Sequence, residues 1–265
     1  MIPALGLLGA AAMGALLLTE RRRRGTAERL AASAMETLLN AIDANDPVTG
    51  AHVRRVAAVA LELAQALGLD ERQQRTVERV ALFHDIGKIH EALFDILHDA
   101  NSLTRDERAA VATHPRRGSE VLEPLEAFYP ELCAGVLAHH ERWDGTGYPQ
   151  GLKGRDIPLA ARIVALADSF DAITHSRRYS SGRSDAAAAE QILAGRGTQF
   201  DPELVDLFLA PPVLAEVARA RAAALRPRAK GSRRRNRRAS PAPDVIFRWR
   251  SGAPGRQSRA RAAAR

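Results

Sequence analysis

The sequence has a single cysteine, and aromatic residues make up only 5% of its 265 residues. One cysteine excludes an intramolecular disulfide, and it argues against a structural zinc site built from thiolates. This residue, Cys133, lies in an apolar stretch without other cysteines nearby, so we interpret it as a core residue rather than a reactive thiol. The composition is compatible with a reducing compartment, and the length suits one folded domain with extensions.

Segments in which apolar and polar residues alternate, as they do in half-buried strands, are also missing. Apolar residues instead recur at helical spacing in residues 53–67, a pattern that ends at Gly68, and again in residues 159–173. The sequence therefore predicts an all-α fold. We expect a helical bundle with an N-terminal apolar helix before it and a disordered basic C-terminal tail after it.

Acidic side chains are scarce at the C-terminal end of the chain. Residues 211–265 carry 16 basic and 2 acidic residues, whereas the other 210 residues carry 23 basic and 29 acidic ones. The net charge of +8 at pH 7 therefore belongs to the tail and not to the folded part. Such a segment cannot bury a core, so we expect a mostly disordered tail, with the disorder beginning at about residue 225. It is either merely solvated or contacts anionic lipid or nucleic acid through its arginines.

The N-terminus begins with a long apolar run. Residues 2–18 would form a helix about 26 Å long, slightly shorter than the hydrocarbon core of a bilayer. Residues 21–24 are all arginine, and an apolar run followed by positive charge is the order of a membrane anchor, not of a cleaved signal peptide. We therefore expect anchoring at the inner membrane with the rest of the chain in the cytoplasm. The alternative is a peripheral or merely buried helix.

Two predicted helices lead to histidines. Thr104 and Glu107 have the spacing of a capping box, which predicts a helix from there to His114, where Pro115 interrupts it. Residues 132–137 also have helical spacing. His139 and His140 would continue the inward face of that second helix, just before a glycine-rich turn.

Six polar residues stand on, or at the ends of, helix faces whose other members are apolar. They are His52, His84, His114, His139, His140 and Asp168. Burying one such group without a partner is costly, and a single one would most simply be a hydrogen-bonded core residue. Six of them in one core favour a metal centre.

Asp85 completes a set of five imidazoles and two carboxylates. That is too many ligands for one ion and suits two, with a carboxylate able to bridge them. The set fits iron, manganese or another borderline divalent metal better than structural zinc or calcium. Two such ions can bind a phosphodiester and activate a water as nucleophile. Lys88, four residues after His84 and on the same predicted helix face, could contact the phosphate or protonate the leaving group.

These residues carry a family resemblance. Residues 84–88, His-Asp-Ile-Gly-Lys, resemble the signature of the HD superfamily of phosphohydrolases. Residues 139–149, His-His-Glu-Arg-Trp-Asp-Gly-Thr-Gly-Tyr-Pro, resemble the extended motif of its HD-GYP subgroup. Further matches lie at residues 46–52, 114–118, 151–158, 167–174 and 197–202, so that the resemblance covers about residues 36–210.

The resemblance implies a phosphodiesterase that hydrolyses cyclic di-GMP to pGpG, and in some members on to GMP, with two metal ions. The implied ligands of one metal are His52, His84, Asp85 and Asp168. The implied ligands of the other are Asp85, His114, His139 and His140. By motif position, Lys88 would contact the scissile phosphate, while Tyr148 and Arg177 would bind the guanine end of the substrate. Tyr148 could equally serve only to lock the turn.

Two departures from the family pattern bear on the site. Residues 90–102 replace the usual Gly-Ile-Pro-Asp segment that helps to cover the metals. Val48 stands where members with three metals carry a glutamate, which favours two metals here.

The sequence thus predicts three parts: an anchor with its arginine cluster at 1–24, an HD-GYP-like catalytic domain at 25–210, and the tail at 211–265. Two other functions stay open at this point. One is a module that binds cyclic di-GMP or a partner protein with little turnover. The other is a phosphohydrolase for another cyclic dinucleotide, such as 3′,3′-cyclic GMP-AMP, or for a nucleotide. A homo-oligomer is compatible with each function.

Overall fold

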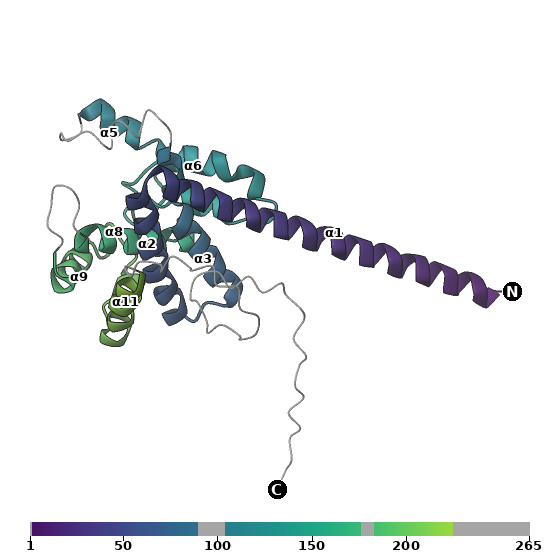
Figure 1. The fold of residues 1–265 in the computed structure, drawn as a ribbon. Coiled ribbons are helices and arrows are strands. Elements are labelled where there is room, and N and C mark those ends of the chain that lie inside the picture. Colours follow the sequence, from purple (N-terminus) through teal and green to yellow (C-terminus); the bar gives the residue numbers. More distant parts are fainter. Residues whose placement is uncertain (1, 90–103, 176–182, 225–265) are drawn as a thin grey trace, which may run out of the picture. The chain divides into compact units, whose positions relative to one another are not determined.

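The computed structural model describes residues 2–89, 104–175 and 183–224. Within these ranges the chain is helical and has no strand, and one isolated bridge pairs Arg196 with Phe200. The all-α prediction is therefore confirmed (Figure 1). The α-helices and the 3-10 helices (η) are α1 (Ile2–Asn45), α2 (Pro47–Ala66), α3 (Glu71–Phe83), η1 (Ile86–Ile89), α5 (Arg105–Val111), α6 (His114–Leu122), η2 (Glu123–Leu125), α7 (Leu132–Leu137), η3 (Gly154–Asp156), α8 (Leu159–Thr174), α9 (Asp185–Ala194), α10 (Pro202–Phe208) and α11 (Pro211–Ala224).

The contacts of the chain divide it into two units between Arg29 and Leu30, inside helix α1. The second unit holds the last part of α1 together with the described helices from α2 to α11. Across the described residues, none of the helices combines the length and the apolar character needed to cross a membrane. The anchor at residues 2–18 and its boundary at residue 24 stay predictions.

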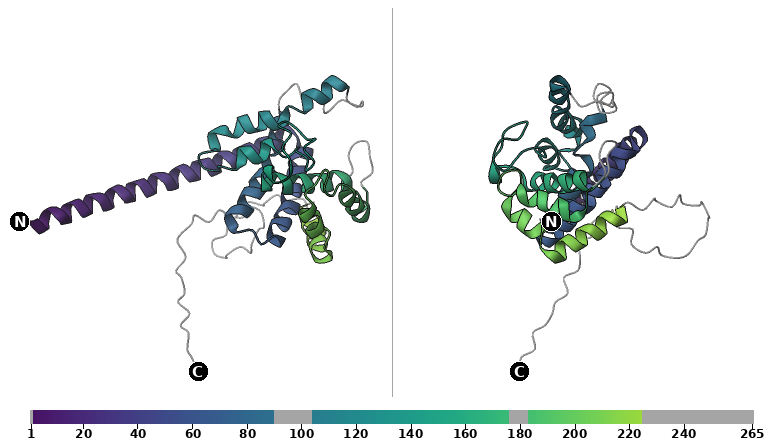
Figure 2. Two further views of the ribbon diagram at one scale, coloured as in Figure 1. Left: turned by 180° about the vertical axis from the view of Figure 1, so that it is seen from behind. Right: turned by 90° about the vertical axis from the view of Figure 1, so that its left-hand side faces the viewer.

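Helix α2 lies at the centre of the helical domain. The carboxylate of Asp46 caps its N-terminus by accepting a hydrogen bond of 2.9 Å from the backbone N–H of Val48. Pro47 occupies the first turn, where a helix needs no backbone N–H. The helix ends just before Gly68, whose φ of +70° is a conformation that glycine adopts without strain. Helix α2 packs against α3, α8 and α11, and these helices lie side by side (Figures 1 and 2).

The apolar core forms where these helices meet. Leu63 of α2, Phe83 of α3 and Phe170 of α8 are fully buried, and the last part of α1 adds Met35 and Ile42. The apolar faces that the sequence predicts for residues 53–67 and 159–173 are the faces that pack in this core. Burial of apolar surface contributes roughly 25 cal/mol per Å² to stability. This burial fixes the positions of α2, α3 and α8, and these helices carry candidate site residues on or next to them.

Helix α11 extends the folded domain past residue 210. Val217 is fully buried in the common core, and Arg221 donates a hydrogen bond of 2.6 Å to Asp185 of α9. The boundary predicted at residue 210 therefore lies too early, because the alanine- and arginine-rich composition of this segment conceals one buried helix face. The rest of the predicted tail, residues 225–265, lies outside the described residues.

Candidate metal centre

Seven side chains that the sequence selects as ligands come together at the junction of α2, α3, α6, α7 and α8. The nitrogen and oxygen atoms of six of them form two groups, and within each group the atoms lie within 4.8 Å of one another. The first group is His52, His84 and Asp85, and the second is His114, His139 and His140. The sequence therefore selected residues that the fold does bring together.

Asp85 belongs to the first group and also faces the second. Its Oδ2 atom is 3.5 Å from Nε2 of His84, and its Oδ1 atom is 3.3 Å from Nε2 of His114. The seventh residue, Asp168, joins the first group, because its Oδ1 atom is 3.1 Å from Nε2 of His52. One carboxylate thus faces both groups, which is the arrangement that two neighbouring cations with a shared ligand need.

Hydrogen bonds on the outer side of the site orient the imidazoles. The Nδ1 atoms of His84, His114 and His139 lie 2.8, 2.7 and 2.6 Å from the backbone carbonyl oxygens three residues earlier. A carbonyl oxygen can only accept, so each Nδ1 atom carries the proton and donates. The Nε2 lone pairs consequently point into the site, as in metal-binding histidines.

The inward-facing nitrogens form a set that suits cations. The Nε2 atoms of His114 and His139 are 3.2 Å apart, and burial lowers the pKa of His139 well below its usual value. In the described part of the chain, Nε2 of His84 is buried without a hydrogen-bond partner. Lone pairs that face each other repel, and buried polar atoms without partners are costly, unless a cation lies among them. The residues present therefore fit a pair of divalent metal ions.

Charges around the carboxylates keep them ready to bind metal. Burial alone would raise the pKa of Asp85, but the ammonium of Lys88 and the neighbouring imidazoles hold it well below its usual value. Burial likewise opposes ionisation of Asp168, but the hydrogen bond from His52 and the charges of His84 and His52 together outweigh it, so the pKa of this carboxyl is lowered. Burial lowers the pKa of His140 to about 3, which leaves its imidazole neutral. The site thus offers charged carboxylates, together with neutral imidazoles at His139 and His140.

His52 differs from His84, His139 and His140, because its pKa is raised whereas theirs are lowered. Burial lowers its pKa, but hydrogen bonds with Asp168 and Asp171 outweigh burial and raise it from 6.5 to about 9. The folded pKa lies above the unfolded one, so charged His52 stabilises the protein fully below pH 6.5, and this contribution is lost as the pH rises through about 9.

We expect a matching pH dependence. With a chelator present, the Tm of the wild type should fall more between pH 6.5 and pH 9 than the Tm of a His52→Gln variant. Metal affinity should change in the opposite direction, because the metal must displace the His52 proton and binds more tightly as the pH rises. Thermal unfolding and metal titration across this range measure both trends. Equal pH slopes for the two proteins would contradict the assignment of the proton to His52.

Lys88 lies on a different secondary-structure element from the one predicted. Helix α3 ends at Phe83, and Lys88 lies on the 3-10 turn η1, not on the helix that precedes His84. Its Nζ atom is 2.7 Å from the carboxylate of Asp85, with which it forms an ion pair. On this turn Gly87 packs against the backbone of α6, a long-range contact that helical periodicity does not reveal.

The second helix boundary also differs from the prediction. The capping box of Thr104 and Glu107 is confirmed at the start of α5, but this helix ends at Val111. His114 begins helix α6, and Pro115 lies in its first turn. Proline stabilises that position because the first turn of a helix uses no backbone N–H, so this proline starts a helix instead of ending one.

The third boundary concerns the histidine pair. Helix α7 ends at Leu137, and His139 and His140 lie in the turn that follows it, not on the helix itself. His139 is almost fully buried, whereas His140 is partly exposed and stacks on the ring of Tyr148, with the ring centres 4.9 Å apart and the planes 23° from parallel. The tyrosine therefore packs against a proposed ligand, and about a third of it, 36%, is exposed.

Glu141 holds the loop that follows the histidine pair, a role that the sequence did not reveal. Its buried carboxylate accepts hydrogen bonds from the backbone N–H groups of Gln150, Gly151 and Leu152, at 2.6, 3.1 and 3.1 Å. These bonds fold the loop back and fix the position of Tyr148. The only signal in the sequence is a carboxylate inside a glycine-rich motif, and the backbone groups that donate to it are not apparent from spacing.

Replacing Glu141 by glutamine should open this loop. The amide has one accepting oxygen, and its NH₂ group would face backbone donors, so we expect the free energy of unfolding to fall by about 1–3 kcal/mol. Urea unfolding measures this change. Glu203→Gln is a suitable control, because this residue makes an exposed ion pair with Arg155, and the control should stay close to the wild type. Equal stability of the two variants would contradict the role of Glu141.

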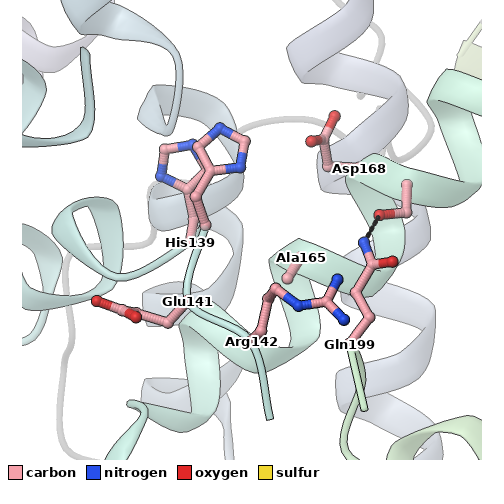
Figure 3. A pocket seen from close by; sticks show the side chains of 8 residues that line it. His139, Glu141, Arg142, Ala165, Asp168 and Gln199 are labelled. Atoms are coloured by element: carbon pink, nitrogen blue, oxygen red, sulfur yellow. Dashed lines mark hydrogen bonds between the residues drawn. The ribbon is translucent and has the colours of Figure 1, made fainter. Parts of the chain in front are cut away.

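A small cavity of about 50 Å³ adjoins the centre (Figure 3). The ring of His139 and the carboxylate of Asp168 lie on two sides of it, and the side chains of Arg142 and Gln199 lie on a third. Arg142 donates hydrogen bonds to Asp144 and Thr146, so the loop holds this side chain in place. The cavity is lined by His139, His140, Glu141, Arg142, Ala165, Asp168, Ser169 and Gln199.

Two predicted parts of the site lie outside the described residues. They are Arg177, expected at the guanine end of the substrate, and residues 90–102, expected to cover the metals. Val48, which replaces the glutamate of members with three metals, is 72% exposed on the first turn of α2.

Comparisons with known proteins agree with this architecture. Residues 36–204 match the sequence model of the HD domain. The chain is 42% identical over 192 residues to the cyclic di-GMP phosphodiesterase response regulator RpfG of Xanthomonas campestris pv. campestris, covering 72% of this chain and 48% of that protein. It is 39% identical over 174 residues to 3′3′-cGAMP-specific phosphodiesterase 2 of Vibrio cholerae, covering 65% of this chain and 33% of that protein.

The fold itself has a counterpart among solved structures. A cyclic GMP-AMP specific phosphodiesterase of V. cholerae superposes with a TM-score of 0.53 and 22% identity, covering 72% of this chain and 52% of that one. At this identity the likeness shows the fold alone. The chain spans about a third to a half of the length of the curated relatives named above. The domain match nevertheless covers most of the present sequence, and the chain therefore belongs to the HD-domain family, with motifs of the HD-GYP type.

Proposed function

We propose that this protein is a metal-dependent phosphodiesterase that hydrolyses cyclic di-GMP to pGpG, with GMP as the product of any second cleavage. The observation that carries the proposal is the pair of ligand groups with Asp85 between them. Relatives that are 42% and 37% identical bear the name cyclic di-GMP phosphodiesterase, which supports this substrate class.

The proposed cofactors are two divalent ions, iron or manganese. His52, His84 and Asp168 would hold one ion, the histidines of the second group would hold the other, and Asp85 would be shared. Nitrogen-rich sets with some carboxylate oxygen and no thiolate suit these metals. When bound, the ions supply charge to stabilise the phosphorane-like transition state and acidify a water to serve as nucleophile.

The chain's own residues would orient the substrate and manage its protons. Hydrolysis to pGpG breaks one bond between phosphorus and a ribose 3′ oxygen, and that oxygen must gain a proton. Lys88 holds its ammonium beside Asp85, where it can contact a phosphate oxygen or supply this proton. Tyr148 keeps one ring face on His140 and can offer the other to a base. Arg177 is the proposed partner of the guanine end.

Incubating purified protein, loaded with iron or manganese, with a panel of cyclic dinucleotides tests the proposal. We expect cyclic di-GMP to be converted to pGpG, and we expect a chelator to stop the reaction. Binding of cyclic di-GMP without product would support a receptor instead of an enzyme. Hydrolysis that continues unchanged after the chelator has removed the metal would contradict the proposed chemistry.

A second substrate has specific support. The relative that is 39% identical bears the name 3′3′-cGAMP-specific phosphodiesterase, so the same dinucleotide panel should include 3′,3′-cyclic GMP-AMP. A ratio of kcat/KM values above about 10 in favour of one dinucleotide corresponds to roughly 1.4 kcal/mol and would decide between the two.

The apolar run near the N-terminus and the basic tail support a location at the inner membrane. The arginines at 21–24 follow an apolar run, which supports anchoring of residues 2–18 at the inner membrane with the HD domain in the cytoplasm. The basic tail would add contacts with anionic lipid or nucleic acid. Recovery of the full chain in the soluble fraction without detergent would contradict the anchor.

A further inference from the structure

Helices α2 and α8 carry a second pair of charged residues, one turn beyond the proposed ligands. Arg55 follows His52 by three residues on α2, and Asp171 follows Asp168 by three residues on α8, a spacing that places each pair on one helix face. Both are buried, with 3% of Arg55 and 1% of Asp171 exposed. The guanidinium donates two hydrogen bonds to the carboxylate, from Nε at 2.7 Å and from Nη2 at 2.9 Å.

Asp171 also contacts the proposed ligand His52. The Nδ1 atom of His52 lies 2.7 Å from Oδ2 of Asp171, while its Nε2 atom faces Asp168 at 3.1 Å. Three of the other proposed ligand histidines have Nδ1 bonded to a neutral backbone carbonyl. Among these four imidazoles, His52 is thus the one whose outer nitrogen faces a charged carboxylate.

This difference should make the two metal positions unequal. A carboxylate that accepts a bond from the outer nitrogen of a histidine fixes the ring and makes the inner nitrogen a stronger ligand. Arg55 in turn fixes the carboxylate in a two-point contact. The position at His52 also has a second carboxylate, Asp168, whereas the three ligands that belong only to the other position are all imidazoles. Additional negative charge among the ligands strengthens the binding of a hard divalent cation.

We propose that Asp171, held by Arg55, is a positioning residue for His52 that makes the metal position at His52 the tighter of the two. The ion held by His114, His139 and His140 then dissociates first. This inference rests on the two-metal centre of the proposed function. It adds an order of metal loss and two residues that contact neither substrate nor metal.

Metal binding by the whole chain tests this proposal without any activity measurement. Protein loaded with Mn²⁺ and dialysed against a weak chelator should lose one of its two ions first and then show the electron paramagnetic resonance spectrum of an isolated Mn²⁺ ion. In Asp171→Asn, the affinity for the remaining ion should fall about 10–100-fold, because the amide cannot replace the charged acceptor at His52.

A matched control separates this effect from a loss of stability. Asp201 is also a buried carboxylate paired with an arginine of α8, Arg162 at 2.6 Å, and it accepts a second hydrogen bond from the backbone N–H of Glu203. Asp201→Asn should lower the Tm but leave the affinity for the retained ion within about threefold of the wild type. Arg55→Lys keeps the positive charge and the carboxylate at His52, so it should weaken metal binding less than Asp171→Asn does.

The outcomes are distinct. Simultaneous loss of both ions from the wild type, or equal metal affinities in Asp171→Asn and Asp201→Asn, would overturn the proposal. If Asp171→Asn fails to fold, the comparison of Arg55→Lys with Asp201→Asn decides: the proposal requires weaker metal binding in Arg55→Lys, and equal affinities overturn it. A wild type that releases its ions in two steps but hydrolyses no dinucleotide would contradict the proposed function and leave this inference standing.

Discussion

Replacing Asp85 by asparagine is expected to lower kcat for cyclic dinucleotide hydrolysis by about 1000-fold or more. This carboxylate lies 3.5 Å from His84 and 3.3 Å from His114, so its charge serves both ligand groups. An amide of the same shape is neutral, and it also leaves the ammonium of Lys88 without its ionic partner. The bound metal should fall together with the rate. Product analysis by chromatography and metal analysis of the same sample measure the two effects.

The control for Asp85→Asn is a carboxylate of similar size away from the centre. Asp206 forms a surface ion pair with Arg196 at 2.6 Å, so Asp206→Asn should keep both the metal and the rate of the wild type. An Asp85→Asn protein that retains two ions and hydrolyses the substrate within tenfold of the wild type would show that the shared carboxylate is not a ligand. A loss of metal without a loss of rate would point to chemistry that needs no metal at all.

The sequence predicts the fold and the proposed ligands for one physical reason. Helical periodicity marks which faces are buried, and polar residues such as His84 and Asp168 on those faces need partners that only a metal or a hydrogen bond can provide. The family resemblance then groups the ligands into two sets. Both steps use local patterns, which is why the apolar faces of α2 and α8 could be predicted.

Contacts between distant segments could not be predicted in this way. Asp171 and His52 are separated by 119 residues, and nothing in the spacing of either helix shows that they meet. The three backbone donors of Glu141 become neighbours only after the loop has turned back on itself. The helix ends near Lys88 and His114 were misplaced for the same reason, because tertiary contacts and not local propensity decide where these helices stop.

The turn after His84 shows how a residue without a side chain supports the metal centre. A Cβ atom added to Gly87 would lie 2.1 Å from the backbone oxygen of His114 and 2.7 Å from the backbone nitrogen of Gly118. Gly118 itself has little room, because its own Cβ would lie 3.3 Å from the backbone nitrogen of Gly87. Two glycines thus allow η1 and α6 to approach closely, and this approach places Asp85 beside His114.

Gly87→Ala is therefore expected to have the second large effect, on stability and on activity together. The methyl group meets backbone atoms, which cannot rotate away as a side chain could, so η1 and α6 must separate. We expect the free energy of unfolding to fall by about 3 kcal/mol. Moving Asp85 away from His114 by even about 1 Å should lower kcat about 100-fold. Urea unfolding, and hydrolysis followed over a range of metal concentrations, measure the two losses.

The combination of losses distinguishes this contact from an ordinary packing defect. A Gly25→Ala variant adds the same methyl group to helix α1, where the nearest atom in its surroundings is Nη1 of Arg29 at 3.8 Å. It should keep the activity of the wild type and stabilise the helix by up to about 1 kcal/mol. If Gly87→Ala lowers stability but keeps the metal and the full rate, the close approach only supports packing. If it lowers both, while added metal restores part of the rate, the contact between the two backbones sets the distance between the two ligand groups. That result would explain why a glycine follows the His-Asp pair at this point of the chain: the shared carboxylate can face both groups only if the turn that carries it touches the helix that begins with His114.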